Sequence, residues 1–192
     1  MKKIFYTLLC LLLIIPTVAA DETKDVEAML KAKVEAVLTV LQNKTLEQQD
    51  KNKITTEIVE PMFDFLLMAK LALGKNHWNG ITREKQEQFT ELFVKILRNS
   101  YLEKLTLYEN ETVTIQKASQ VGKRIHVPTE VISQNNRISI LYKLYKSTDE
   151  WKIYDLEIEG VSLIKSYRTQ FDSELSTGTI DDLIREMSAS KT

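Results

Sequence analysis

The sequence predicts an α+β fold, in which a twisted antiparallel sheet of about four strands packs against N-terminal and C-terminal helices. Two observations favour it. Apolar residues recur every three to four positions across residues 23–105 and again after Gly160, which is typical of helices that bury one face. Between these regions apolar and polar residues alternate, which is typical of half-buried strands. Helices, then strands, then helices is the segregated α+β order, and 192 residues favour one domain.

The first two expected helices follow directly from this spacing. Residues 23–41 carry an apolar stripe from Val26 to Leu41 at three- and four-residue steps. Thr45 is expected to cap a second helix, because a threonine hydroxyl can accept a hydrogen bond from the open N–H groups of a first turn. This second helix runs to Val59 and ends before a proline.

Two more helices are expected before the strands begin. Pro61 suits the first turn of a helix over residues 62–73, which Gly74 closes. Residues 78–80, Trp-Asn-Gly, predict a turn. The helix that begins at Thr82 is expected to be the longest, with an apolar stripe that continues to Leu105.

Four stretches of alternating residues predict the strands. They are residues 112–116, 124–132, 137–146 and 151–159, and Pro128 implies an edge position or a bulge in the second. Because the connections between them are short and polar, we expect an antiparallel meander. The apolar phase of the last strand is expected to hold Tyr154, Leu156 and Ile158.

Helix returns after Gly160, with a stripe over residues 163–175 that Gly178 ends and a last short helix over residues 180–187. Gly160-Val161-Ser162 begins like the nucleophile elbow of a hydrolase. However, Ile164 replaces the second glycine, and no histidine follows that could act as a base. Ser162 is therefore expected to cap the helix.

The first twenty residues predict a secretory signal peptide. Lys2 and Lys3 precede an apolar run that ends at Ile15, and small residues follow, with cleavage expected after Ala20. The only cysteine, Cys10, lies inside this segment and follows a bulky leucine, so a lipid-attachment site is not expected. The working protein would then be a single domain over residues 21–192, without disulfides and with a net charge of about −3. Such a balance does not favour nucleic-acid binding.

Few side chains in this domain could carry catalysis or bind a metal. His77 and His126 lack a partner at metal-ligand spacing, so we expect both on the surface and no metal site. Asp155, Glu157 and Glu159 alternate along one strand and could bind calcium or do acid–base work. A solvated sheet face, or salt links to lysines on the neighbouring strand, is the favoured interpretation.

Three blocks of residues carry a resemblance to a known family. The first is Val59-Glu60-Pro61-Met62-Phe63-Asp64-Phe65, which continues to Trp78. The second covers residues 86–101. The third begins at Trp151-Lys152-Ile153-Tyr154-Asp155-Leu156 and continues through Gly160 to Gly178. In this order, after a signal peptide, they resemble the MlaC family of periplasmic phospholipid-binding proteins, also called toluene-tolerance proteins.

The resemblance implies a periplasmic lipid carrier without catalysis or a cofactor. Such a protein holds phospholipid acyl chains in an apolar cavity between the sheet and the helices. It shuttles the lipid between an outer-membrane MlaA-type lipoprotein–porin complex and an inner-membrane ABC transporter with a MlaD-type ring, and so maintains outer-membrane lipid asymmetry. The carrier is expected to be a monomer that does not bind nucleic acid.

The residues expected to contact the acyl chains are apolar members of the resembling blocks and the neighbouring sheet. Val161 is the sharpest choice, because it stands at the expected strand-to-helix junction and is small. Arg168 is a candidate for the head-group phosphate, with an ion pair to Asp155 or Glu159 as the favoured alternative. The expected tail contacts are Phe63, Leu66, Met68, Phe89, Phe93, Tyr142, Leu144, Val161, Ile164 and Tyr167.

Two other classes of protein stay open. Periodicity does not distinguish a cleft between the layers from a fully packed core. A hydrolase or isomerase that acts on a hydrophobic substrate would need a base in such a cleft, and Asp64 and Asp155 are the candidates. Asp64 is better suited to stabilise the first turn of its helix. A periplasmic scaffold or chaperone would have a filled core and a protein partner.

Overall fold

The computed structural model describes residues 22–102, 112–133, 136–148 and 150–189. The signal segment and Leu105 lie outside these residues. The helices are α1 (Glu22–Gln42), α2 (Gln48–Val59), the 3₁₀ helix η1 (Glu60–Met62), α3 (Phe65–Leu73), α4 (Lys75–Asn79), α5 (Arg83–Leu97), the π-helix η2 (Arg98–Leu102), α7 (Leu163–Leu175) and α8 (Ile180–Ala189). The strands are β1 (Thr112–Ile115), β2 (Ser119–Val121), β3 (Arg124–Ser133), β4 (Asn136–Ser147), β5 (Glu150–Ile158) and β6 (Val161–Ser162).

The strands form one antiparallel sheet in the order β1-β3-β4-β5-β6, and β2 pairs with β3 on the same side as β1. The predicted α+β fold and the four-strand meander are therefore confirmed. Two short strands, β2 and β6, extend the sheet to six. Pro128 lies in β3 opposite Leu141 of β4, while its carbonyl accepts a hydrogen bond from the Gln116 N–H.

A bulge in β5 decides which face its side chains occupy. Leu144 of β4 pairs with Ile153, but the preceding residue, Lys143, pairs with Asp155, so Tyr154 is left over. Ile153 and Leu156 consequently lie on one face, while Tyr154 and Asp155 lie on the other. The prediction that Tyr154 shares a face with Leu156 and Ile158 was wrong, because alternation holds only within an unbroken strand.

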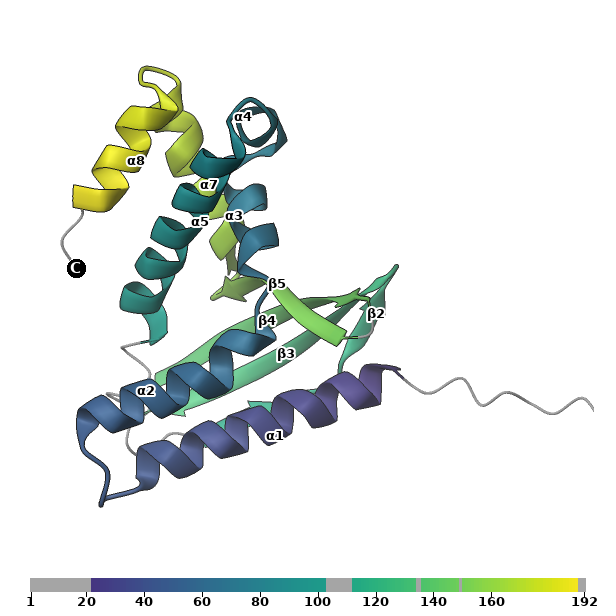
Figure 1. Cartoon of the computed structure of the whole chain (residues 1–192). Helices are drawn as coiled ribbons and strands as arrows, with labels where there is room; N and C mark the ends of the chain where they lie inside the picture. The colour runs from purple at the N-terminus through teal and green to yellow at the C-terminus, as the bar shows by residue number, and fades with distance from the viewer. Residues whose placement is uncertain (1–21, 103–111, 134–135, 149, 190–192) are drawn as a thin grey trace, which may run out of the picture.

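The first of two cores lies between α1 and one face of the sheet. Val26 and Leu30 of α1 pack there with Met62 and with Ile125, Val127, Leu144 and Ile153, all of them buried. α2 lies alongside α1, and the two helices follow the same side of the sheet (Figure 1). Within the described residues, no helix has the length and apolar character needed to cross a membrane.

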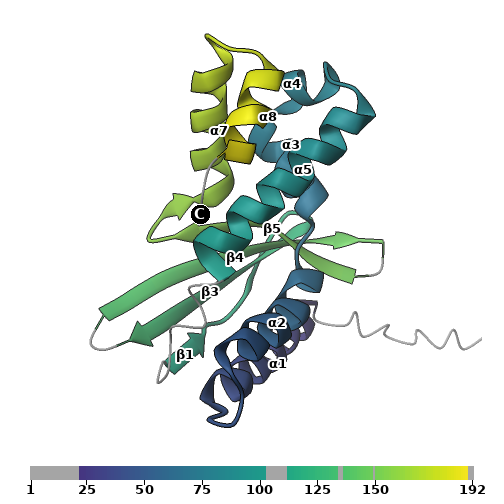
Figure 2. The same ribbon diagram turned by 60° about the vertical axis from the view of Figure 1, so that its left-hand side comes forward.

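The second core belongs to the helices that stand beyond β5. α3, α4, α5, α7 and α8 form a bundle next to the β5 side of the sheet (Figure 2). Its centre holds Phe89 and Phe93 of α5 with Phe171 of α7, and the Phe171 ring meets each of the other two edge to face. Phe63 and Leu156 pack against both cores and so occupy the junction between them.

Three local predictions about the helices were wrong. Thr45 does not cap α2, because its N–H and hydroxyl both bind the side-chain oxygen of Asn43. The third helix does not begin at Met62: Phe63 forms a bridge with Ile153, and α3 starts at Phe65. Residues 78–80 are not a simple turn, because α4 runs through residues 75–79.

The helix ends were predicted more accurately elsewhere. Thr82 caps α5 and Ser162 caps α7, each through its hydroxyl. In the described residues α1, with 21 residues, is longer than α5, with 15, since η2 takes over at Arg98.

Candidate functional site

One row of side chains crosses five strands of the sheet on its apolar face. Ile115, Thr129, Ile140, Ile158 and Val161 lie opposite one another on β1, β3, β4, β5 and β6. The three isoleucines are half-buried, and Val161 at the end of the row is 59% exposed. The apolar face of the sheet therefore extends to the β6 edge, where the rest of the protein covers it only in part.

The neighbouring rows of side chains show how burial of the apolar face changes along the strands. Towards one end, the row of Ile125, Leu144 and Ile153 is fully buried beneath α1. Towards the other end, the row of Val113, Val131 and Ile138 is only half-buried. We refer to the half-covered part as the apolar stripe, which consists of Val113, Ile115, Val131, Ile138, Ile140, Ile158 and Val161.

Thr129 is a polar residue within this apolar surrounding. It is 1% exposed, and its hydroxyl has no hydrogen-bond partner among the residues that the structure describes. An unpartnered buried hydroxyl costs roughly 1–3 kcal/mol. No pattern in the sequence indicated this unpartnered hydroxyl, because a threonine at this point of an alternating strand is ordinary.

The predicted tail contacts fall into separate groups rather than one cluster. Met68, Phe89, Phe93 and Ile164 are buried in the core of the helical bundle, where Tyr167 packs edge to face on Phe93. Leu144, with Tyr142 beside it, belongs to the sheet core, and Phe63 lies at the junction. Leu66 is 57% exposed on α3, and Val161 ends the apolar stripe. Lipid contact at these residues, and the apolar cavity between the layers, stay predictions.

Tyr142 follows the stripe directly along β4 and lies in the row of Val127 and Leu156. Burial raises the pKa of its phenol to about 12, so its hydroxyl stays neutral. A neutral phenol keeps this part of the sheet compatible with apolar contacts.

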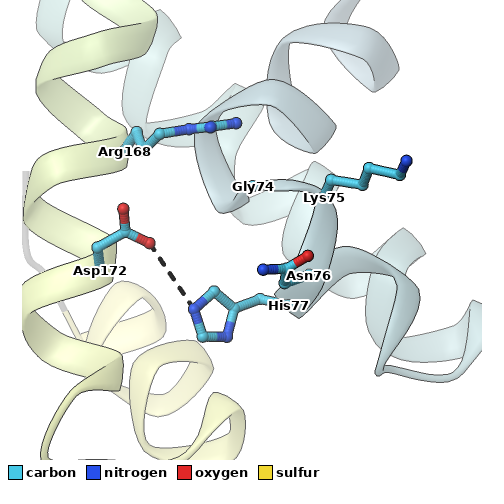
Figure 3. Close-up of a pocket in the computed structure, with 6 residues that line it drawn as sticks. All are labelled: Gly74, Lys75, Asn76, His77, Arg168 and Asp172. Carbon is cyan, nitrogen blue, oxygen red and sulfur yellow. Dashed lines mark ion pairs between the residues drawn. The ribbon is translucent and has the colours of Figure 1, made fainter.

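Arg168 lies in a different environment, a polar pocket of about 220 Å³ between α7 and the start of α4 (Figure 3). Its guanidinium donates hydrogen bonds to the Leu71 carbonyl, with Nε at 2.9 Å. The favoured prediction, that Arg168 forms an ion pair with Asp155 or Glu159, was wrong. His77 of α4 approaches Asp172 of α7 at 3.7 Å across the same pocket, and Gly74, with φ of +85°, turns the chain there. The head-group role of Arg168 stays a prediction.

The acidic residues of β5 form salt links, as predicted. The Lys143 ammonium lies 3.1 Å from Asp155 and 2.8 Å from Glu157. Burial alone lowers the pKa of Lys143, but the hydrogen bonds to these carboxylates outweigh it and the pKa is raised. Asp155, 6% exposed, also accepts from the Ser162 hydroxyl and the Ile164 N–H, which fixes α7 to the sheet.

Asp64 is likewise held by structural contacts. One carboxylate oxygen caps α3 by accepting from the Leu67 N–H at 2.9 Å, as its expected role in the first turn requires. The other accepts from the Tyr145 hydroxyl. No group of three histidine, cysteine, aspartate or glutamate side chains among the described residues could hold a metal ion.

An ion pair at the junction of the two cores was not predicted from the sequence. Arg98, the first residue of η2, donates from Nε to Glu60 of η1 at 2.8 Å. The two residues are 38 positions apart, so no local pattern in the sequence indicated the contact.

The fold and the apolar stripe define an α+β domain whose sheet leaves part of its apolar face half covered. The family model described as MlaC protein matches residues 31–189. The chain belongs to the MlaC family.

Curated relatives and a solved structure agree with this assignment. The Haemophilus influenzae intermembrane phospholipid transport system binding protein MlaC is 24% identical over 98% of this chain and 93% of its own length. The Pseudomonas putida toluene tolerance protein Ttg2D is 28% identical over 59% of this chain and 54% of its own. A Ralstonia solanacearum phospholipid-binding protein, solved in complex with a phospholipid, superimposes with a TM-score of 0.75 at 25% identity, over 84% of this chain and 94% of that one.

Proposed function

We propose that this protein is a periplasmic phospholipid carrier that shelters acyl chains against the apolar stripe and the junction of its two cores. Residues 1–20 would direct its export, and residues 21–192 would form the carrier. It would exchange lipid with an outer-membrane MlaA-type lipoprotein–porin complex and an inner-membrane ABC transporter with a MlaD-type ring. In this way it would maintain the lipid asymmetry of the outer membrane.

The observation that carries the proposal is the likeness to the Ralstonia protein, which was solved with a phospholipid bound and shares nearly its whole fold with this chain. The apolar stripe supports it independently. Seven apolar side chains on one sheet face are half-buried or exposed, and an acyl chain laid along them would remove their remaining apolar surface from water.

The energy of such an interaction decides how the carrier must release its lipid. Two acyl chains bring roughly thirty methylenes, whose transfer from water is worth on the order of 24 kcal/mol in gross terms. Ordering of the chains reduces this figure, since non-covalent affinities level off near about 18–21 kcal/mol. Release into water would still be very slow. The lipid would therefore leave only when the carrier is docked on a partner that offers the chains another apolar site.

Neither of the two candidate bases favours the enzyme alternative. Asp64 and Asp155 were its two candidate bases, and both carboxylates are occupied by hydrogen bonds that hold helices in place. A general base must instead reach the proton that it abstracts.

Mass spectrometry of an organic extract tests the proposal directly. The purified protein is expected to yield phospholipid close to one molecule per chain, whereas a scaffold would yield none and an enzyme would turn over a lipid ester or isomer. Transfer is tested by mixing lipid-loaded protein with the MlaD-type ring and following the lipid into the ring fraction. Protein that never carries phospholipid would exclude the carrier.

A further inference from the structure

The chain passes between its two cores at η1 and at the end of α5. η1 is followed directly by Phe63, which packs against both cores. η2 continues α5 as a five-residue π-helix, an irregularity that occurs frequently at functional sites. The α5 end that leads into η2 lies on the side where the bundle faces the sheet (Figures 1 and 2), and η2 contacts α2.

Arg98 and Glu60 join these two segments. The guanidinium uses Nε and one terminal nitrogen, at 2.8 and 2.5 Å, on the same oxygen of Glu60. Its other N–H groups have no partner among the described residues. The pair is accessible, since 42% of the Arg98 side chain and 27% of the Glu60 side chain are exposed. A guanidinium can bind two oxygens at once through its planar fork of N–H donors. The single Glu60 oxygen therefore uses only part of the hydrogen-bonding capacity of Arg98.

We propose that Arg98 binds the phosphate of the lipid head group, and that Glu60 occupies the guanidinium until the lipid arrives. This inference rests on the proposed function and assigns the polar end of the same ligand. A phosphate presents oxygens spaced for the guanidinium fork and carries a full negative charge, so it competes with the carboxylate for the same N–H donors. The exchange of one anion for another leaves the arginine paired throughout.

The position of Arg98 favours a lipid phosphate over free phosphate. It lies at the junction where Phe63 meets both cores, next to the part of the fold proposed to hold the chains, whereas Arg168 lies in a polar pocket and bonds a backbone carbonyl. A phosphate tethered to acyl chains arrives at Arg98 at high effective concentration, which a free anion does not.

Two lipids with the same chains separate the head-group contact from binding of the tails. Delipidated protein is incubated with vesicles of dioleoylphosphatidylglycerol that hold a minor fraction of dioleoylglycerol. The protein is then re-isolated, and the two bound lipids are quantified by mass spectrometry. Arg98→Ala is expected to lower the bound ratio of phosphatidylglycerol to diacylglycerol about tenfold. Arg98→Lys is expected to lower it by less, because the charge stays and the fork is lost.

Glu60→Gln is the matched control, because it breaks the same ion pair and leaves the guanidinium in place. It is expected to keep the lipid ratio of the unmodified protein or to raise it. Equal losses in Arg98→Ala and Glu60→Gln would show that the ion pair is merely structural and would overturn the proposal. Thermal unfolding followed by circular dichroism is the check that both variants fold.

Failure of the head-group site and failure of the carrier function give different results. If Arg98→Ala binds both lipids as the unmodified protein does, only the head-group assignment is wrong. If the unmodified protein takes up neither lipid, the carrier function is wrong. Calorimetric titration with inorganic phosphate tests whether Arg98 binds free phosphate instead of a lipid phosphate. Saturable binding that Arg98→Ala abolishes, without any change in the lipid ratio, would identify a site for free phosphate and overturn the lipid assignment.

Discussion

Substitution of Val161 by glutamate separates lipid binding from folding. Val161 ends the apolar stripe on β6 and is 59% exposed. A carboxylate at this position remains in water as long as no lipid covers it, so the free energy of unfolding should change by less than about 0.5 kcal/mol. When an acyl chain covers the position, the carboxylate loses its water and gains no partner.

Protonation sets the size of this penalty. A covered glutamate can take up a proton instead of staying charged, and each pH unit above its ordinary pKa of about 4.3 costs about 1.36 kcal/mol. At about pH 7 the cost is about 3.7 kcal/mol, which weakens lipid binding roughly 500-fold. Because the complex takes up a proton that the free protein does not hold, affinity rises as pH falls. At about pH 5.3 only a tenfold deficit should remain.

The assay is phospholipid content per chain after incubation with vesicles, measured by mass spectrometry at both pH values. Val161→Gln is the control, because it adds a polar group of similar size that does not titrate. Glutamine should lower lipid content modestly and equally at both pH values. If Val161→Glu holds as much lipid as the unmodified protein near neutral pH, or if its loss matches that of glutamine at every pH, Val161 does not contact the lipid.

Three further substitutions test the packing. Thr129→Val should raise the free energy of unfolding by about 1 kcal/mol in urea denaturation, because it removes an unpartnered buried hydroxyl, and a decrease would reveal a partner for that hydroxyl. Phe93→Ala should lower it by about 3–5 kcal/mol, since the ring is fully buried among other aromatic rings, and a loss below about 1 kcal/mol would contradict that packing. Asp155→Asn should lower it by about 2 kcal/mol by weakening the contacts to Lys143 and Ser162, and an unchanged urea midpoint would show that they contribute nothing.

Much of the fold followed from the sequence because the long elements have strong periodicity. α1, α5 and α7 and the strands β3 and β4 each place a regular set of apolar residues on one face, which the 3.6- and 2-residue periods identify. Helix caps were predicted where a hydroxyl had no competing local partner, as at Thr82 and Ser162. The cap at Thr45 failed because Asn43, two residues earlier, binds it instead.

The errors concern contacts between distant residues. The start of α3 is set by Ile153, whose carbonyl accepts from the Asp64 N–H at 2.9 Å, and no helical pattern in residues 62–73 reveals that bond. The ion pair of Arg98 with Glu60 has the same character. Periodicity also assigns a residue to a face without stating what covers that face, which is why the exposure of Val161 could not be predicted.

The bulge at Tyr154 fixes the register of the second half of β5. If the strand kept Tyr154 but continued from Ile153 without the bulge, so that Tyr154 paired with Lys143, Asp155 and Glu157 would turn towards α1, while Leu156 and Ile158 would turn towards water. A strand without the bulge would thus place two carboxylates in an apolar interior and strip Lys143 of its partners. Homologues that keep every residue between Ile153 and Gly160 should therefore keep the bulge as well.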